Sequence, residues 1–118
     1  MTEEDLEQAT IFEWAELMEN VCPVLKLLYA VPNGGYRPPV TVATLKRTGV
    51  KSGVPDMMLP VPRNGYHGLY IELKRRKGGK VSLNQKRWLI DLSNQGYYAT
   101  VCYGADEAIK LIEKYLGI

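Results

Sequence analysis

The stretch VPDMMLPVPRNGYHGLYIELK, from Val54 to Lys74, contains the clearest structural pattern in this chain. Two apolar runs flank the turn-forming residues 62–65, so we predict strands over 56–61 and 68–75 that pair as a hairpin. Alternate side chains of a strand share a face, so Glu72 and Lys74 project to the same side. The hairpin would bring Asp56, at the start of the first strand, next to Glu72. The sequence therefore predicts two carboxylates and one ammonium group close together on a sheet.

The segments around this hairpin predict a small α/β domain with a mixed sheet flanked by helices. Thr2 followed by Asp5 is typical of an N-cap and acidic first turn, which predicts a helix over 3–20. Ser82 and Gln85 match a capping box that opens a helix over 82–95. The remaining patterns predict strands over 24–31 and 97–103, a short helix over 40–48 and a closing amphipathic helix over 105–116. The expected order is α-β-(α)-β-β-α-β-α.

Length and cysteine usage limit the class of protein. At 118 residues the chain is long enough for one domain, spanning 1–118. It has neither a basic signal-type N-terminus nor an apolar run of about 20 residues, so we expect a cytoplasmic protein without a membrane span. Cys22 and Cys102 lack metal-ligand spacing and His67 is the single histidine, which argues against zinc sites and Cys–His nucleophiles.

Charge is distributed unevenly along the chain. The first nineteen residues contain seven acids and no base, whereas residues 37–87 contain twelve lysines and arginines and only two acids, Asp56 and Glu72. A basic face of this kind is typical of nucleic-acid binding. Two carboxylates that repel each other are best relieved by a divalent cation, and oxygen ligands without His or Cys favour Mg²⁺ or Mn²⁺. A Glu-x-Lys pair alone is also an ordinary ion pair on a half-exposed strand.

Five short motifs follow one another along the chain and together have a familiar pattern. They are Glu4-x-x-x-Gln8, Pro32-Asn33-Gly34-Gly35, Gly49-x-x-x-Gly53-x-Pro55-Asp56, Glu72-x-Lys74 and Gln85. Over nearly its whole length the chain resembles the VRR-NUC (virus-type replication and repair nuclease) family of the PD-(D/E)XK superfamily, in its free-standing phage or bacterial form. The resemblance implies a restriction-endonuclease-like core and the cytoplasm of a bacterial or phage-infected cell.

The resemblance also implies a catalytic set. Asp56 and Glu72 would be metal ligands, with the backbone carbonyl of Leu73 as a further oxygen. Lys74 would orient or activate the attacking water, and Glu4 would reach the metal from the first helix.

Two of these assignments have competitors within the sequence. Glu3, Glu7 and Glu13 compete with Glu4, which is preferred because it shares a helical stripe with Gln8, Ile11 and Ala15. Gln85 is either only the capping partner of Ser82, or a catalytic side chain that reaches the scissile phosphate or Lys74.

Further residues are candidates for contacts with nucleic acid. Asn33 and Gly34 either form a plain turn or let the backbone approach a phosphate closely. The simplest role of the central basic residues is phosphate binding, although some are expected to be ordinary solvated charges; they are Lys46, Arg47, Lys51, Arg75, Arg76, Lys77 and Lys80. No interleaved aromatic platform of the single-strand-binding kind accompanies them, which favours duplex or branched DNA.

These observations predict a Mg²⁺- or Mn²⁺-dependent DNA endonuclease, because phosphodiester cleavage needs both a metal site and a basic surface. The resemblance further implies a homodimer that acts on branched DNA such as four-way (Holliday) junctions. The alternatives are a DNA-binding module that does not cleave and a sequence-specific restriction-type nuclease.

Overall fold

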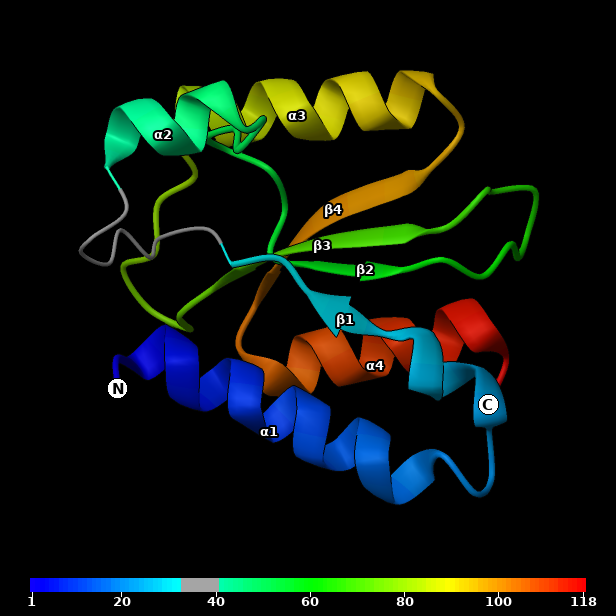
Figure 1. The fold of residues 1–118 in the computed structure, drawn as a ribbon. Coiled ribbons are helices and arrows are strands. Elements are labelled where there is room, and N and C mark those ends of the chain that lie inside the picture. The colour runs from blue at the N-terminus through cyan, green and yellow to red at the C-terminus, as the bar shows by residue number, and fades with distance from the viewer. Residues whose placement is uncertain (33–40) are drawn as a thin grey trace.

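A four-stranded mixed sheet separates two helical layers (Figure 1). The computed structural model describes residues 1–32 and 41–118, so the predicted contacts of Asn33 and Gly34 lie outside the described residues. The strands are β1 (Tyr29–Ala30), β2 (Met57–Leu59), β3 (Leu69–Lys74) and β4 (Tyr98–Tyr103), in that spatial order. Helices α1 (Glu3–Met18) and α4 (Ala105–Leu116) lie on one side, and α2 (Val42–Arg47) and α3 (Leu83–Asn94) lie on the other. The predicted class, a small mixed sheet flanked by helices, is confirmed.

The predicted hairpin forms from β2 and β3. These strands are antiparallel, with Met57 opposite Ile71 and Leu59 opposite Leu69. Asn64 and Gly65 form the turn with φ of 53° and 82°, and backbone hydrogen bonds join Arg63 to Tyr66 on either side of it. Positive φ at both central residues matches the right-handed twist of a hairpin and explains why an Asn-Gly pair stands here.

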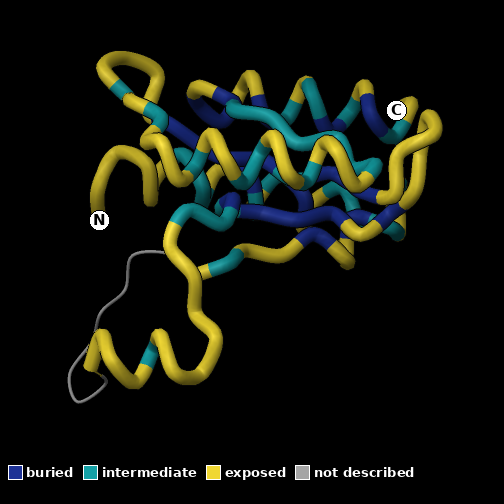
Figure 2. Tube along the Cα trace, turned by 90° about the horizontal axis from the view of Figure 1, so that it is seen from above, coloured by how far each residue is buried: buried dark blue, intermediate teal, exposed yellow. Residues whose placement is uncertain are grey.

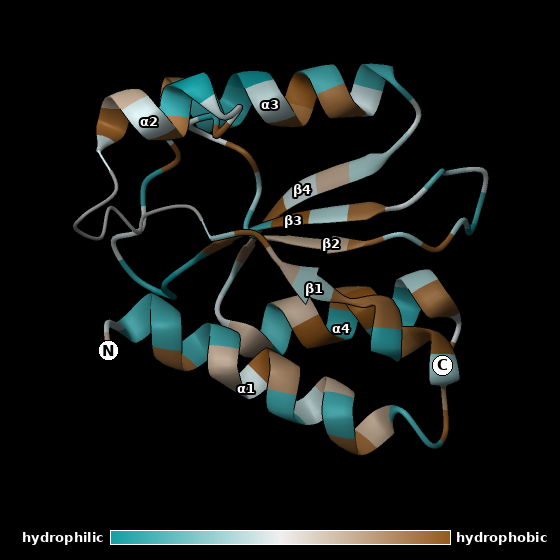
Figure 3. Cartoon of the chain, in the orientation of Figure 1, coloured by the Kyte–Doolittle hydropathy of each residue, from teal (hydrophilic) through white to brown (hydrophobic). Residues whose placement is uncertain are grey.

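The core lies between the sheet and the α1–α4 layer. Its members include Ile11 and Ala15 of α1, Ile112 of α4, and Ile71 and Leu73 of β3. Figure 3 shows α1 and α4 as alternating hydrophobic and hydrophilic bands, as expected for helices that bury one face. Because strand side chains alternate, this packing leaves Glu72 and Lys74 on the side of the sheet that faces α3.

The predicted strand over 24–31 is wrong in its first half. The chain instead forms a 3₁₀ helix, η1 (Pro23–Leu27), and β1 contains only Tyr29 and Ala30. Leu25 and Leu28 are both buried in the core. A strand would place residues three apart on opposite faces, whereas a 3₁₀ turn aligns them. Pro23 supports this choice because its fixed φ suits the first position of a helix.

The predicted helix starts are confirmed. Thr2 with Asp5 and Ser82 with Gln85 both form complete capping boxes. Strands β2 and β3 are shorter than the predicted runs over 56–61 and 68–75. Within the described ranges, no helix is long and apolar enough to span a bilayer. Figure 2 shows α2 and the chain directly after it standing away from the body, with mostly exposed residues.

Candidate active site

Asp56 and Glu72 lie next to each other, as the hairpin predicts. Extending the β2–β3 register by one residue places Asp56 opposite Glu72. The backbone N–H of Leu73 donates a 2.7 Å hydrogen bond to Asp56 Oδ2, which fixes this carboxylate against β3. Glu72 is almost completely buried, with 2 % of its surface exposed. The structure therefore pairs two carboxyl groups, one of them deep in the protein.

Lys74 completes the arrangement from the same face of β3. Its Nζ lies 3.5 Å from Glu72 Oε2, and its side chain is only 10 % exposed. A buried ion pair costs desolvation energy on both partners, so it is weak evidence for a purely stabilising role. The pair does fix an ammonium group beside the Glu72 carboxyl group.

Gln85 is the capping partner of Ser82 and also contacts Glu72, a partner that the sequence analysis did not name. Its Oε1 accepts a 2.8 Å hydrogen bond from the backbone N–H of Ser82, and its Nε2 donates a 3.2 Å hydrogen bond to Glu72 Oε2. The side chain reaches the Glu72 carboxylate rather than Lys74. The first turn of α3 is thereby tied to the charged face of β3.

The loop before Asp56 is held by α3 through contacts that the sequence analysis missed. Trp88 Nε1 donates to the carbonyl of Ser52 at 3.0 Å, and Asn84 Nδ2 donates to Ser52 Oγ at 3.2 Å. Gly53 has φ of +91°, and a Cβ there would come within 2.9 Å of the backbone of Asn84. The glycine in the predicted Gly-x-Pro-Asp motif was the available signal, since only glycine fits so close a crossing.

The electrostatics of Glu72 are unusual for an acid. Burial, and then the neighbouring Asp56 carboxyl group, raise the pKa of Glu72 from 4.5 to about 8, against the opposing effect of the Lys74 ammonium group. Its Oε1 atom is buried and has no hydrogen-bond partner among the described residues. A divalent cation would offset the repulsion between the two carboxylates and give this oxygen a partner, so the donor set fits such an ion.

This shift predicts how metal-free stability depends on pH. The folded-state pKa of Glu72 lies above its unfolded value, so its contribution to stability is fully present below pH 4.5 and is lost as pH rises through about 8. Glu72→Gln removes this titration. We therefore expect the free energy of unfolding of the variant, relative to wild type, to increase from pH 5 to pH 9 in EDTA. Urea unfolding of both proteins measures this, and a difference that stays constant with pH would contradict the assignment.

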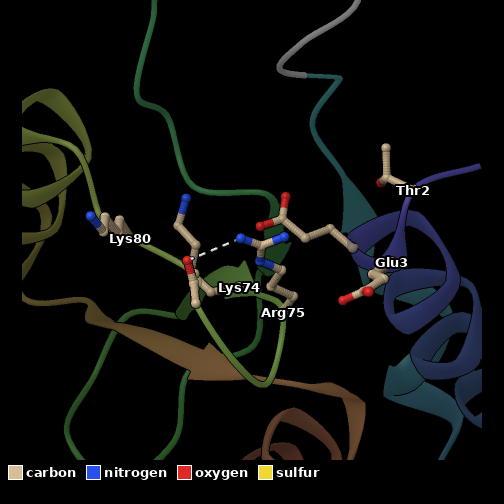
Figure 4. A pocket seen from close by; sticks show the side chains of 8 residues that line it. Thr2, Glu3, Lys74, Arg75 and Lys80 are labelled. Atoms are coloured by element: carbon tan, nitrogen blue, oxygen red, sulfur yellow. Dashed lines mark hydrogen bonds between the residues drawn. The ribbon is translucent and has the colours of Figure 1, made fainter.

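Glu4 reaches the same region from α1. A pocket of about 380 Å³ is lined by Thr2, Glu3, Glu4, Lys74, Arg75, Gly78, Gly79 and Lys80 (Figure 4). Glu4 belongs to the stripe of α1 whose later members, Ile11 and Ala15, are buried, as the sequence analysis assumed. Glu3 lines the pocket as well. In the described part of the chain, no three His, Cys, Asp or Glu side chains lie close enough together to form a metal site, so Glu4 does not join Asp56 and Glu72 in one cluster.

Glu7, the competing acid, has a different set of contacts. Its Oε1 accepts a hydrogen bond from Arg76 Nε at 3.2 Å, and its Oε2 accepts one from the backbone N–H of Ala105. Arg76 also pairs with Asp106 at 3.4 Å. Sequence reasoning missed this cluster because its members lie far apart along the chain.

The predicted phosphate contacts occupy two exposed segments. Lys46 and Arg47 lie on α2 and Lys51 lies just after it, while Arg75, Lys77 and Lys80 lie in the loop after β3. Arg75 Nη2 donates to the carbonyl of Gly78 at 3.2 Å, a bond drawn in Figure 4. Arg76, by contrast, is engaged by two carboxylates.

Comparison with known proteins agrees with this architecture. The sequence matches the VRR-NUC domain over residues 2–106. A solved structure described as a VRR_NUC domain protein superposes with a TM-score of 0.84 and 29 % identity, covering 99 % of this chain and 90 % of that one. Comparison with functionally curated proteins gave no match. The domain match covers most of the sequence, so this chain belongs to the VRR-NUC family and is a nuclease of the PD-(D/E)XK type.

Proposed function

We propose that this protein is a divalent-metal-dependent DNA endonuclease whose active site is built on Asp56, Glu72 and Lys74. The observation that supports this most is the environment of Glu72. A buried carboxyl group lies beside a second carboxyl group, with one oxygen unpartnered among the described residues and an ammonium group 3.5 Å from the other oxygen. Such an arrangement is costly unless a cation is held there.

Asp56, Glu72 and the backbone carbonyl of Leu73 would hold Mg²⁺ or Mn²⁺. Glu4 lies outside the Asp56–Glu72 cluster, in the pocket shared with Lys74, and would contribute a further oxygen from α1. The ion, when bound, supplies Lewis-acid stabilisation of charge on the phosphate and lowers the pKa of water. Lys74 would orient the attacking water through its ammonium group, which is fixed by the ion pair with Glu72. Gln85 holds the Glu72 carboxylate in place through its Nε2 donor. Because Glu72 and Lys74 are buried, the electrostatic interactions that they make are stronger than they would be in water.

The exposed basic segments supply the surface for the DNA backbone. They comprise Lys46, Arg47 and Lys51 around α2, and Arg75, Lys77 and Lys80 after β3. Lysine and arginine contacts to phosphate provide affinity without sequence specificity, and this affinity falls steeply with salt. Asn33 and Gly34 remain candidates for the same role.

The two alternative functions receive less support. A module that only binds DNA gains nothing from a buried carboxyl pair on its phosphate-facing side, because those charges repel the ligand. A restriction-type enzyme needs a surface that reads bases in addition to the catalytic core. The described residues form a single layered core with no added recognition unit.

One experiment tests the proposal directly. Purified protein is incubated with labelled linear, flap, splayed and four-way DNA in Mg²⁺, in Mn²⁺ and in EDTA. Cleavage that requires a divalent ion is expected. Binding without cleavage in every ion would support the binding module, and discrete bands from unrelated plasmids would support the restriction-type enzyme.

We further expect a homodimer that prefers four-way junctions. One chain of this size offers one catalytic site, and a two-fold dimer would place two sites on two strands of a two-fold junction. Light scattering should report about twice 13.3 kDa. Junctions should be nicked on opposing strands in preference to linear duplex. A monomer that prefers flaps or ends would leave the nuclease chemistry intact but would end the junction assignment.

A further inference from the structure

Three distant segments meet at the side chain of Glu7. Its two carboxylate oxygens accept hydrogen bonds from different elements: Oε1 from Arg76 Nε, in the loop after β3, and Oε2 from the backbone N–H of Ala105, at the first residue of α4. Arg76 also reaches Asp106 of α4 at 3.4 Å. We call Glu7, Arg76 and the Ala105 N–H the clamp. It links α1, the end of β3 and the start of α4.

The clamp is joined to the strand that carries the proposed catalytic residues. Arg76 lies two residues after Lys74, and the carbonyl of Lys74 accepts a 2.8 Å hydrogen bond from the N–H of Gly104. The stem of Arg76 passes against Gly104, where a Cβ would come within 2.6 Å of Arg76 Cγ. Gly104 also has φ of +86°, which a residue with a side chain rarely adopts. The backbone around Lys74 is thus fixed to the same point that Glu7 binds.

Apart from the Thr2–Asp5 capping box, the first turns of α1 have few buried contacts to hold them. Residues 1–6 are exposed, and the first buried residue of the helix is Ile11. The Glu7 side chain is 20 % exposed and Arg76 is 58 % exposed, so the helix start depends on a polar contact at the protein surface. A helix end with few buried contacts opens easily unless something ties it down.

Glu4 lies on this weakly held turn. It precedes Glu7 by three residues, which corresponds to about 4.5 Å along the helix axis and about 60° around it. The clamp therefore fixes the turn that brings Glu4 into the pocket shared with Lys74. It fixes both the position of this turn along the helix axis and its rotation about that axis.

We infer that Glu7 and Arg76 are positioning residues that hold the turn bearing Glu4 in the pocket shared with Lys74, next to the proposed metal site, and that Arg76 is not a phosphate contact. This inference rests on the proposed function, since it requires a metal site that includes Glu4. It reassigns Arg76 from the predicted DNA surface. It also gives Glu7 a role distinct from metal ligation, because both of its oxygens already accept hydrogen bonds.

Two substitutions that change the charge in opposite directions distinguish a positioning role from a purely electrostatic effect on the metal site. Glu7→Gln removes a negative charge near the site and Arg76→Met removes a positive one. If only the electrostatic field mattered, the first change would weaken cation binding and the second would strengthen it. The clamp predicts that both weaken it, by roughly 10-fold as for other residues that orient a ligand. In the double variant the losses should not add, because the two residues act through one contact.

The experiment is calorimetric titration of metal-free protein with Mn²⁺, with thermal unfolding of each variant as a check on folding. Glu13→Gln is the matched control, since it removes the same charge from an exposed position of α1 and should leave the Kd unchanged. Glu4→Gln should weaken binding at least as much as Glu7→Gln. If Glu7→Gln does not fold, Arg76→Met alone is sufficient for the test. The clamp predicts weaker Mn²⁺ binding by this variant, whereas a purely electrostatic effect predicts tighter binding.

The outcomes are distinct. If wild type binds no Mn²⁺, both the proposed function and this inference fail. If wild type binds Mn²⁺ and Arg76→Met binds it more tightly or equally, the metal site stands and the clamp is overturned.

The affinity for DNA, measured in Ca²⁺ without cleavage, tests the reassignment of Arg76 separately. Arg76→Met should leave the salt dependence unchanged, whereas loss of a phosphate contact would reduce the slope by about 1.

Discussion

Asp56→Asn and Glu72→Gln are each expected to abolish metal-dependent cleavage while the protein stays folded. A bound cation contributes several kcal/mol of transition-state stabilisation, so its loss should lower turnover by roughly 10³-fold or more. Both variants keep the volume of the side chain. Asp56→Asn also keeps an oxygen that can accept the hydrogen bond from the N–H of Leu73. The defect should therefore lie in metal binding rather than in the fold.

Stability measurements provide the control for this prediction. Because the two carboxyl groups lie side by side and Glu72 is buried, replacing either group with an amide should leave metal-free stability unchanged or raise it at neutral pH. Saturating metal should stabilise wild type, by about 2.7 kcal/mol at 100 times the Kd, and should not stabilise either variant. Near wild-type cleavage by either variant would show that the metal is held elsewhere.

Much of this site was accessible from the sequence because it depends on local geometry. The spacing of Glu72 and Lys74 follows from strand alternation, and the Asn64-Gly65 turn sets the register that brings Asp56 opposite Glu72. The capping boxes at Thr2 and Ser82 likewise depend on residues three positions apart. For features of this kind, a short window contains all the interacting groups.

The features that the sequence did not reveal depend on contacts between distant segments. Glu7 is one of seven acids near the N-terminus, and nothing in its neighbours distinguishes it from Glu13. Its partners, Arg76 and Ala105, are brought to it only by the packing of α1 and α4 on the sheet. The 3₁₀ helix at Pro23–Leu27 has the same origin, since an apolar run fits a strand until the core requires Leu25 and Leu28 on one side.

Lys74→Met is expected to lower turnover at saturating metal by a factor on the order of 10²–10⁴, the usual range for a positioned proton-transfer group. Methionine keeps most of the apolar stem but removes the ammonium group that lies 3.5 Å from Glu72 Oε2. Single-turnover cleavage with Mn²⁺ measures the rate of the chemical step. Calorimetry on the same protein measures the Kd for the ion.

The expected result for Lys74→Met depends on pH, because Lys74 affects the pKa of Glu72. The Lys74 ammonium lowers the pKa of Glu72, so its removal should raise that pKa further above about 8 and make protons compete more strongly with metal. Metal binding by Lys74→Met should thus be weaker at pH 7 and recover at pH 9, while the slow turnover should persist at both. A rate that returns to the wild-type value once the site is saturated would show that Lys74 acts only by keeping Glu72 ionised. A rate that stays low with metal fully bound requires the ammonium group to act on the water or the phosphate, which is the role that its fixed place beside Glu72 supports.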